Sequence, residues 1–120
     1  MQFTSQLAEW RPPDIINEIG AAEGADFLIE LIYAFQGDTA NRVRELRQAI
    51  TGCDLQRVRM ESHTIKGSAS QMGAKGMALV CQEIELAAGA GARDGLEDLA
   101  IKLEQSFADV CRAMAKYSRS

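Results

Sequence analysis

The feature that most constrains this sequence is the absence of proline from nearly all of it. The chain has 120 residues and two prolines, Pro12 and Pro13, so residues 14–120 contain none. Proline lacks a backbone N–H and interrupts helices, which leaves every residue after Pro13 free to be helical. No stretch has the alternating, β-branched pattern of a strand. The sequence therefore predicts an all-α protein.

Apolar residues recur at helical spacing in four long stretches of the chain. In the first stretch Leu31, Phe35 and Leu46 share one stripe, and Gly37 lies between them. A glycine inside a helix costs about 1 kcal/mol relative to alanine. Because the apolar pattern resumes beyond Gly37, we expect one continuous helix there. The four predicted long helices cover residues 25–51, 54–72, 74–88 and 94–117.

Residues that favour helix ends separate these stretches. Asp54 is a good N-cap for the second long helix and Gly73 is a good stop for it. Residues 89–91, with the sequence Gly-Ala-Gly, form a flexible break before the last helix. A shorter helix is expected to run from Asp14, its N-cap, to Gly20, its stop.

Four long amphipathic helices joined by short breaks are typical of an antiparallel up-down-up-down four-helix bundle. We expect the short first helix to cap one end of this bundle. A length of 120 residues suits one core, so residues 1–120 are expected to form a single domain. The composition, with 47% hydrophobic and 25% charged residues, is that of a folded globular protein.

The charge of the chain argues against two classes of partner. The formal net charge is −4, whereas proteins that bind nucleic acid usually carry a basic face. An anionic membrane surface is disfavoured for the same reason. A local cluster of Arg42, Arg44 and Arg47 is interrupted by Glu45, and we expect it to be a solvated helix face. We therefore expect neither nucleic acid nor a membrane as a partner.

The three cysteines, Cys53, Cys81 and Cys111, are odd in number and lack C-x-x-C spacing. This argues against a disulfide scaffold and against a zinc site, so we expect no bound metal. Cys81 and Cys111 fall on apolar stripes and are expected in the core, where free thiols suit a reducing cytoplasm. Residues 1–10 lack the pattern of a signal peptide, and no apolar stretch is long enough to cross a membrane. We expect a cytoplasmic protein.

The chain has a single histidine, His63, within the second predicted long helix. At about 100° per residue, the side chains of this helix divide between two faces. We expect His63 to lie on the polar face, pointing away from the core and towards water. The apolar face holds Leu55, Val58, Ser62, Ile65, Ala69 and Met72, and the polar face holds Gln56, Arg59, His63, Lys66, Gly67 and Ser70.

An exposed histidine beside a lysine suits phosphoryl transfer. A neutral imidazole nitrogen is nucleophilic near neutral pH and can hold a phosphoryl group covalently, and such a transfer needs positioning and charge neutralisation. Lys66, at i+3, neighbours His63 on the helix surface, and Gly67 leaves the same face without a side chain. Gly67, Ser68 and Ser70 are poor helix formers, which indicates a requirement other than helix stability. On these residues alone, an ordinary solvated pair of His63 and Lys66 remains the other interpretation.

The segment around His63 resembles the signature of histidine-containing phosphotransfer (HPt) domains. The matching residues are 63–69 (His-Thr-Ile-Lys-Gly-Ser-Ala) and 72–74 (Met-Gly-Ala). Ile65 and Met72 occupy positions of this motif where leucine is commoner, and both keep the apolar character. Residues 27–32 and 79–86 are similar to the family's flanking helices, so the resemblance covers nearly the whole chain.

The resemblance implies specific roles around His63. His63 would accept the phosphoryl group, Lys66 would stabilise that group, and Gly67 would keep the surface open. In this family a polar residue of the neighbouring helix often hydrogen-bonds the histidine ring, and a carboxylate there would fix the ring tautomer. Glu85 falls at the expected place, with Gln82 as the alternative, and an ordinary solvated Glu85 is the other interpretation.

The same resemblance implies a function in phosphorelay signalling. His63 would accept a phosphoryl group from the aspartyl phosphate of a receiver domain, or from a hybrid histidine kinase, and pass it to another receiver. Magnesium would be bound by the receiver, and we expect no cofactor on this chain, which is expected to be a monomer. Its docking face should have an apolar centre and polar edges. The candidate docking residues are Gln56, Arg59, Met60, Thr64, Gly67 and Ser70.

Three other functions compete with this expectation. A kinase is disfavoured because the chain is short and lacks both the G-x-x-x-x-G-K and the G-x-G-x-x-G phosphate loops, so we expect a carrier rather than an enzyme. A metal or cofactor bundle needs several inward-facing ligands, whereas the chain has one histidine. A helical adaptor bundle, in which His63 is never phosphorylated, is the alternative that we retain.

Overall fold

Helices make up the regular structure of this chain, which was obtained as a computed structural model describing residues 10–23 and 25–118. The all-α prediction is therefore confirmed, and the four long helices lie close to their predicted ranges. The helices are α2 (Asp14–Glu23), α3 (Ala25–Thr51), α4 (Leu55–Gln71), α5 (Lys75–Gly89) and α6 (Leu96–Ser118).

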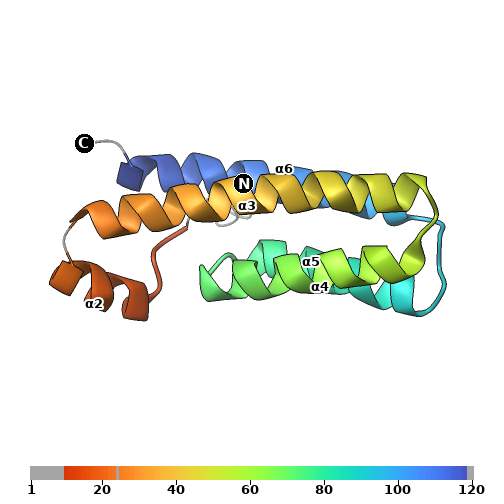
Figure 1. Cartoon of the computed structure of the whole chain (residues 1–120), viewed down its shortest axis with the longest axis horizontal. Helices are drawn as coiled ribbons and strands as arrows, with labels where there is room; N and C mark the ends of the chain where they lie inside the picture. The colour runs from red at the N-terminus through yellow and green to blue at the C-terminus, as the bar shows by residue number, and fades with distance from the viewer. Residues whose placement is uncertain (1–9, 24, 119–120) are drawn as a thin grey trace, which may run out of the picture.

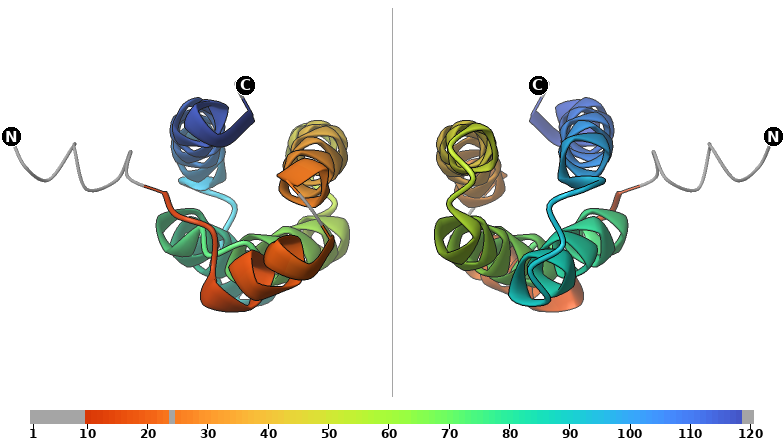
Figure 2. Two further views of the ribbon diagram at one scale, coloured as in Figure 1. Left: turned by 90° about the vertical axis from the view of Figure 1, so that its left-hand side faces the viewer. Right: turned by 90° about the vertical axis from the view of Figure 1, so that its right-hand side faces the viewer.

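The four long helices form an antiparallel up-down-up-down bundle, as predicted. In Figure 1, α3 and α6 form one layer and α4 and α5 form the other, with consecutive helices running in opposite directions. Each long helix packs against two others, in the pairs α3–α4, α4–α5, α5–α6 and α3–α6. The end-on views of Figure 2 show the four helices at the corners of the bundle. The short helix α2 packs on α3 and lies beyond the ends of α4 and α5, so it caps one end.

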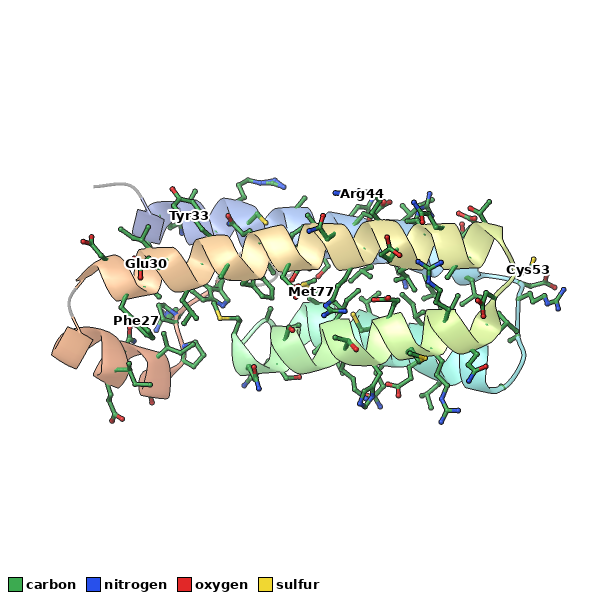
Figure 3. The ribbon with its side chains drawn as sticks, viewed as in Figure 1. Phe27, Glu30, Tyr33, Arg44, Cys53 and Met77 are labelled. Atoms are coloured by element: carbon green, nitrogen blue, oxygen red, sulfur yellow. The ribbon has the colours of Figure 1, made fainter. Side chains whose placement is uncertain are left out.

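The core of the bundle is built from the predicted apolar stripes. Its fully buried side chains come from every long helix and include Ile32, Leu46, Ile65, Met77, Ile84, Leu103 and Met114. Figure 3 shows Met77 between the two layers and Cys53 at the turn between α3 and α4. Cys81 is fully buried, as predicted, whereas Cys111 is only partly buried at the edge of the core.

The ends of the short helix differ from the prediction. Pro13, rather than Asp14, occupies the N-cap position, because its carbonyl oxygen accepts hydrogen bonds from the backbone N–H groups of Ile16 and Asn17. Asp14 is instead in the first turn, where its charge favours the helix dipole. The prediction that Gly20 stops the helix is wrong, since α2 continues to Glu23. Glycine is disfavoured within a helix but does not forbid it.

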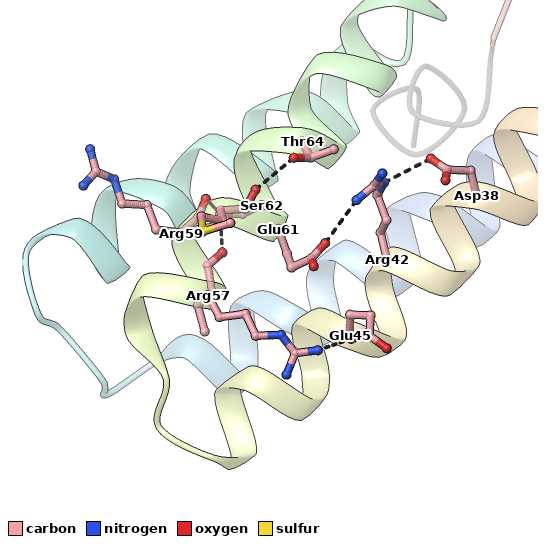
Figure 4. A network of polar contacts seen from close by, with 10 residues as sticks. Asp38, Arg42, Glu45, Arg57, Arg59, Glu61, Ser62 and Thr64 are labelled. Carbon is pink, nitrogen blue, oxygen red and sulfur yellow. Dashed lines mark hydrogen bonds and ion pairs between the residues drawn. The ribbon is translucent and has the colours of Figure 1, made fainter.

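Arginine side chains of α3 connect this helix to both of its long neighbours, α4 in the other layer and α6 in the same layer. Arg42 pairs with Asp38 at 3.1 Å and with Glu61 of α4 at 3.5 Å, and Arg47 pairs with Glu97 of α6 at 2.7 Å. Figure 4 shows the contacts of Arg42. Arg42 and Arg47 keep 38% and 35% of their side chains exposed, so they lie on a solvated face as predicted. What the prediction did not include is their pairing, because the packing of the helices brings acidic side chains within reach. Such exposed pairs contribute about 0–1 kcal/mol each to stability.

The turn between α4 and α5 places these helices side by side. The side chain of Asp54 caps α4 by accepting a hydrogen bond from the N–H of Arg57 at 3.2 Å, as predicted. At the other end Gly73 has a φ of 77°, a conformation that glycine adopts without strain, and α5 begins directly afterwards. Trp10 Nε1 donates a 2.6 Å hydrogen bond to the carbonyl oxygen of Met72, which ties Trp10 to this turn. The tight hairpin brings the middle of α4 alongside the middle of α5.

Candidate functional site

His63 lies on the outer face of α4, as its position in the helical pattern predicts. Its side chain is 66% exposed. The opposite face of α4 is buried in the core through Val58, Ser62, Ile65 and Ala69. Around His63 the polar face is exposed, and only Lys66 is partly buried. Glu61, which precedes the histidine by two positions, is turned towards Arg42 and away from this face.

One carboxylate connects His63 to Lys66. Glu85 of α5 places its Oε2 atom 2.9 Å from Nδ1 of His63 and its Oε1 atom 2.7 Å from Nζ of Lys66. An ionised carboxylate only accepts hydrogen bonds, so Nδ1 of a neutral His63 is the nitrogen that carries the proton. Nε2 then holds a free electron pair on an exposed ring. The chemistry that this geometry supports is nucleophilic attack by Nε2.

The same contacts keep Glu85 ionised. The hydrogen bond from Lys66 is the main cause that lowers the pKa of the Glu85 carboxyl, while its partial burial acts in the opposite direction. The hydrogen bond from His63 lowers the pKa further. Glu85 is therefore negatively charged at neutral pH and is not an ordinary solvated glutamate.

The two candidates for orienting the histidine ring differ in position. Glu85 makes the contact, whereas Gln82, one turn earlier on α5, makes no hydrogen bond to His63 within the described residues. Gln82 is exposed and lines two neighbouring concavities, of about 300 Å³ and about 460 Å³, together with Lys66. The structure therefore brings Glu85 into contact with His63 and leaves Gln82 beside the site.

A concavity of about 410 Å³ surrounds the exposed histidine. It contains most of the candidate docking residues of α4 and is closed on one side by Glu85 of α5. Met60 is exposed in it (63%), but the hydroxyl group of Thr64 is already engaged, donating to the carbonyl oxygen of Met60 at 3.1 Å. The residues that line it are Gln56, Arg59, Met60, His63, Thr64 and Glu85.

Two further candidate docking residues, Gly67 and Ser70, lie on the exposed face beyond His63. A Cβ atom added at Gly67 would meet nothing within 4 Å, so the packing of the bundle does not require glycine there. Ser70 lines the concavity of about 460 Å³ with Lys66. The absence of a side chain at Gly67 therefore leaves open space next to the histidine.

Two exposed leucines of α5 were missed by the sequence analysis. Leu79 is 62% exposed and Leu86 is 65% exposed, and each lines a concavity that also contains Lys66. A signal for them was present, because both fall off the buried stripe of Met77, Cys81 and Ile84. Neither leucine lies on the helix that contains the histidine, so the pattern of α4 alone does not indicate them.

A comparison with known families decides what this arrangement belongs to. Residues 30–115 match the family model of the Hpt domain. The chain belongs to the Hpt domain family. The resemblance seen in the sequence around His63 is thereby confirmed, and the function of the chain is histidine phosphotransfer in phosphorelay signalling.

A solved structure agrees with this assignment to the HPt family. The chain is similar to the crystal structure of histidine-containing phosphotransfer protein B (HptB) from Pseudomonas aeruginosa PAO1, with a TM-score of 0.79 and 27% sequence identity. The match covers 89% of this chain and 93% of that chain. A comparison with curated proteins gave no match. HPt proteins are phosphotransfer intermediates rather than enzymes in the usual sense.

Within residues 10–23 and 25–118, no helix is both long and apolar enough to cross a bilayer. In the same part of the chain, no three histidine, cysteine or acidic side chains are grouped so that they could hold a metal ion.

Proposed function

We propose that His63 is the phosphoaccepting residue of this HPt domain. The observation that carries the proposal is the hydrogen bond between Glu85 and Nδ1 of His63, which leaves Nε2 unprotonated on the exposed side of the ring. The composition supports it as well, because His63 is the only histidine in the chain. A histidine phosphotransfer domain needs one such residue.

The proposed step is a transfer from the aspartyl phosphate of a receiver domain to Nε2. The electron pair of Nε2 attacks phosphorus, the N–P bond forms, and the P–O bond to the aspartate breaks. The electron pair of that bond leaves with the aspartate carboxylate. The proton on Nδ1 stays in place, held by Glu85, so no general base is required. In the onward step an aspartate carboxylate oxygen of a second receiver attacks phosphorus. The new P–O bond forms, the N–P bond breaks, and the electron pair of the N–P bond returns to Nε2.

Lys66 and Gly67 have supporting roles in the proposal. The ammonium group of Lys66 is one turn from His63 and is held in place by Glu85 at 2.7 Å, so it is positioned to stabilise the phosphoryl oxygens. Gly67 gives the partner room to approach, because no side chain occupies the space above it. Magnesium belongs to the receiver in this scheme, and we assign no cofactor to the chain itself.

The proposed docking face spans α4 and α5. It comprises the α4 residues Gln56, Arg59, Met60, Thr64, Gly67 and Ser70, to which we add Leu79 and Leu86. Three of the exposed large hydrophobic side chains of the described residues, Met60, Leu79 and Leu86, are found here. Transient interfaces combine apolar contacts with a polar rim, and this face offers both.

The proposed cellular setting follows from family and charge. The partners are receiver domains and a hybrid histidine kinase, and the phosphoryl group comes from them because the sequence has no nucleotide-binding loop. A net charge of −4 disfavours nucleic acid and anionic membranes as partners. We propose that residues 1–120 act as one monomeric, cytoplasmic domain.

Labelling with a phosphorylated receiver domain tests the proposal. A panel of radiolabelled phospho-receivers from the same organism is incubated with the wild-type chain and with the His63→Gln variant. We expect acid-labile, alkali-stable phosphate on the wild type and none on the variant. If no receiver or hybrid kinase of that organism labels the wild type, the proposal fails and the chain is better described as an adaptor bundle.

A further inference from the structure

The phosphotransfer site has no net charge before it is phosphorylated. Neutral His63, the ammonium of Lys66 and the carboxylate of Glu85 add up to zero, and the carboxylate already engages the ammonium at 2.7 Å. A phosphoryl group brings a charge of about −1.5 to −2 to such a site. Because Glu85 already offsets the charge of Lys66, these three side chains leave the added negative charge without a counter-charge.

Arg59 is the unpaired cation nearest to His63 along α4. It precedes the histidine by four residues, so the two side chains share one helix face. Its guanidinium has no hydrogen-bond or ion-pair partner in residues 10–23 and 25–118. By contrast, Arg57 pairs with Glu45 on α3. Figure 4 shows Arg57 reaching towards α3 and Arg59 extending away from it.

The side chain of Arg59 crosses from α4 to α5 beside the site. A Cβ atom added at Gly89 would lie 3.8 Å from Nε and 3.9 Å from Cδ of Arg59, so the arginine is in contact range of α5 there. Arg59 lines the concavity of about 410 Å³ that contains His63 and the concavity of about 300 Å³ that contains Lys66 and Glu85. The histidine therefore has Lys66 one turn after it and Arg59 one turn before it.

We propose that Arg59 is a second phosphoryl-binding residue, whose guanidinium donates hydrogen bonds to the phosphoryl oxygens carried on Nε2 of His63. This inference rests on the proposed role of His63. A guanidinium presents several N–H donors in a planar fork that matches phosphate oxygens. Arg59 thus stabilises the phosphorylated state of the chain itself, in addition to any contact with a docking partner.

The phosphorus NMR titration of the isolated phosphoprotein tests this inference without a partner. Phosphoramidate, a small chemical donor, phosphorylates the exposed histidine, and the 31P chemical shift of the phosphoryl group is followed against pH. The variants are Arg59→Ala, the charge-preserving Arg59→Lys, and Arg57→Ala as the matched control on the same helix. The equilibrium constant for exchange with a receiver domain is measured for the same four proteins.

A guanidinium at the phosphoryl group favours its dianion, so the titration midpoint should be higher in Arg59→Ala than in the wild type. Arg59→Lys should recover part of the difference, and Arg57→Ala should match the wild type. The exchange equilibrium should move towards the receiver by about fivefold in Arg59→Ala. If the midpoint is unchanged in Arg59→Ala, or moves equally in Arg57→Ala, the inference is wrong, even if receiver exchange is altered. If no receiver phosphorylates the chain, the role of His63 fails, but the chemically phosphorylated protein still decides the role of Arg59.

Discussion

Glu85 is the residue on which the protonation and orientation of the site depend. Its two carboxylate oxygens contact His63 and Lys66 separately, so one side chain fixes the tautomer of the histidine and the position of the lysine. Its lowered pKa keeps it charged while it does so. A glutamine at this position would keep the hydrogen-bonding shape but lose the charge.

The lowered pKa of Glu85 predicts that its contribution to the free energy of unfolding depends on pH. A carboxyl whose pKa is lower in the folded state stabilises the fold above its unfolded value, about 4.5, and loses this contribution as the pH falls through the folded value. Urea unfolding should therefore show wild type more stable than Glu85→Gln at pH 6, by about 1 kcal/mol or less, with the difference shrinking at pH 3. Glu83→Gln, an exposed substitution of the same kind on the same helix, is measured beside it as the control. If wild type and Glu85→Gln differ in free energy of unfolding by the same amount at both pH values, the lowered pKa of Glu85 is contradicted.

A second prediction concerns the reactivity of Cys81. Burial raises the pKa of the Cys81 thiol to about 12, and Cys53 is exposed. Because the thiolate is the reactive form, iodoacetamide at pH 8 should modify Cys53 in the native protein and reach Cys81 only after unfolding. Peptide mass spectrometry after timed labelling measures both rates. Equal native rates for the two cysteines would show that Cys81 is not buried as described.

The sequence was sufficient to place His63 and Lys66 on one exposed helix face, whereas for the neighbouring helix it left Glu85 and Gln82 both open. His63 and Lys66 are on one helix, where spacing alone determines the face, and the family motif indicated a partner on the next helix. The contacts of Arg42 and Arg47 were not predictable in this way. They depend on which acidic side chains the packing of α3 brings within reach, a property of the tertiary structure.

Among the helices, α4 contains a glycine, Gly67, that could be replaced by a larger residue without disturbing the packing of the bundle. Gly67 in α4 and Gly37 in α3 are both inside long helices, and a Cβ atom at either would meet nothing within 4 Å. Helix propensity therefore favours alanine at both positions. The two glycines form a matched pair for separating stability from function.

Replacing these glycines by alanine should have the same effect on stability and different effects on transfer. Gly67→Ala and Gly37→Ala are each expected to raise the free energy of unfolding by about 0.5–1 kcal/mol. Only Gly67→Ala should slow phosphoryl transfer from a receiver, since its methyl group occupies the proposed docking face. Thermal unfolding and transfer kinetics of both variants provide the comparison. Unimpaired transfer by Gly67→Ala would remove that position from the docking face.

The predicted helices match the observed ones most closely where a strong apolar stripe has a clear boundary. The range of α3 agrees at both ends, and Asp54 and Gly73 mark the ends of α4 as expected. The weakest prediction concerns α2, where proline replaces aspartate as the cap and the helix continues through a glycine. A short helix has few apolar positions from which its range can be predicted, and its ends depend on how it packs on the bundle.

At the scale of the whole molecule, one face of the bundle combines the reactive histidine with uncovered apolar side chains. Leu79 and Leu86 of α5 are exposed beside it, and α3 and α6 form the other layer. Tyr33 of α3 is comparably exposed (59%) and lies away from α4 and α5 in Figure 3. The bundle thus offers its own control for a docking experiment.

Truncating the α5 leucines should weaken receiver binding. We expect Leu79→Ala and Leu86→Ala each to raise the Kd for a receiver domain by about three- to tenfold, because apolar contacts near the centre of an interface contribute most to affinity. Tyr33→Ala should leave the Kd unchanged. Isothermal titration with an unphosphorylated receiver measures all three. A larger effect of Tyr33→Ala than of the leucines would place the docking face elsewhere.

In the proposed phosphorylated state, Nε2 of His63 carries the phosphoryl group while Nδ1 keeps its proton against Glu85. The most direct test is NMR of the chain labelled with 15N-histidine and phosphorylated by a receiver domain. Because the chain has one histidine, a single imidazole is observed. We expect one-bond 15N–31P coupling to Nε2 and a retained proton on Nδ1. Coupling to Nδ1, or a phosphorylated protein without any coupling to histidine, would contradict it.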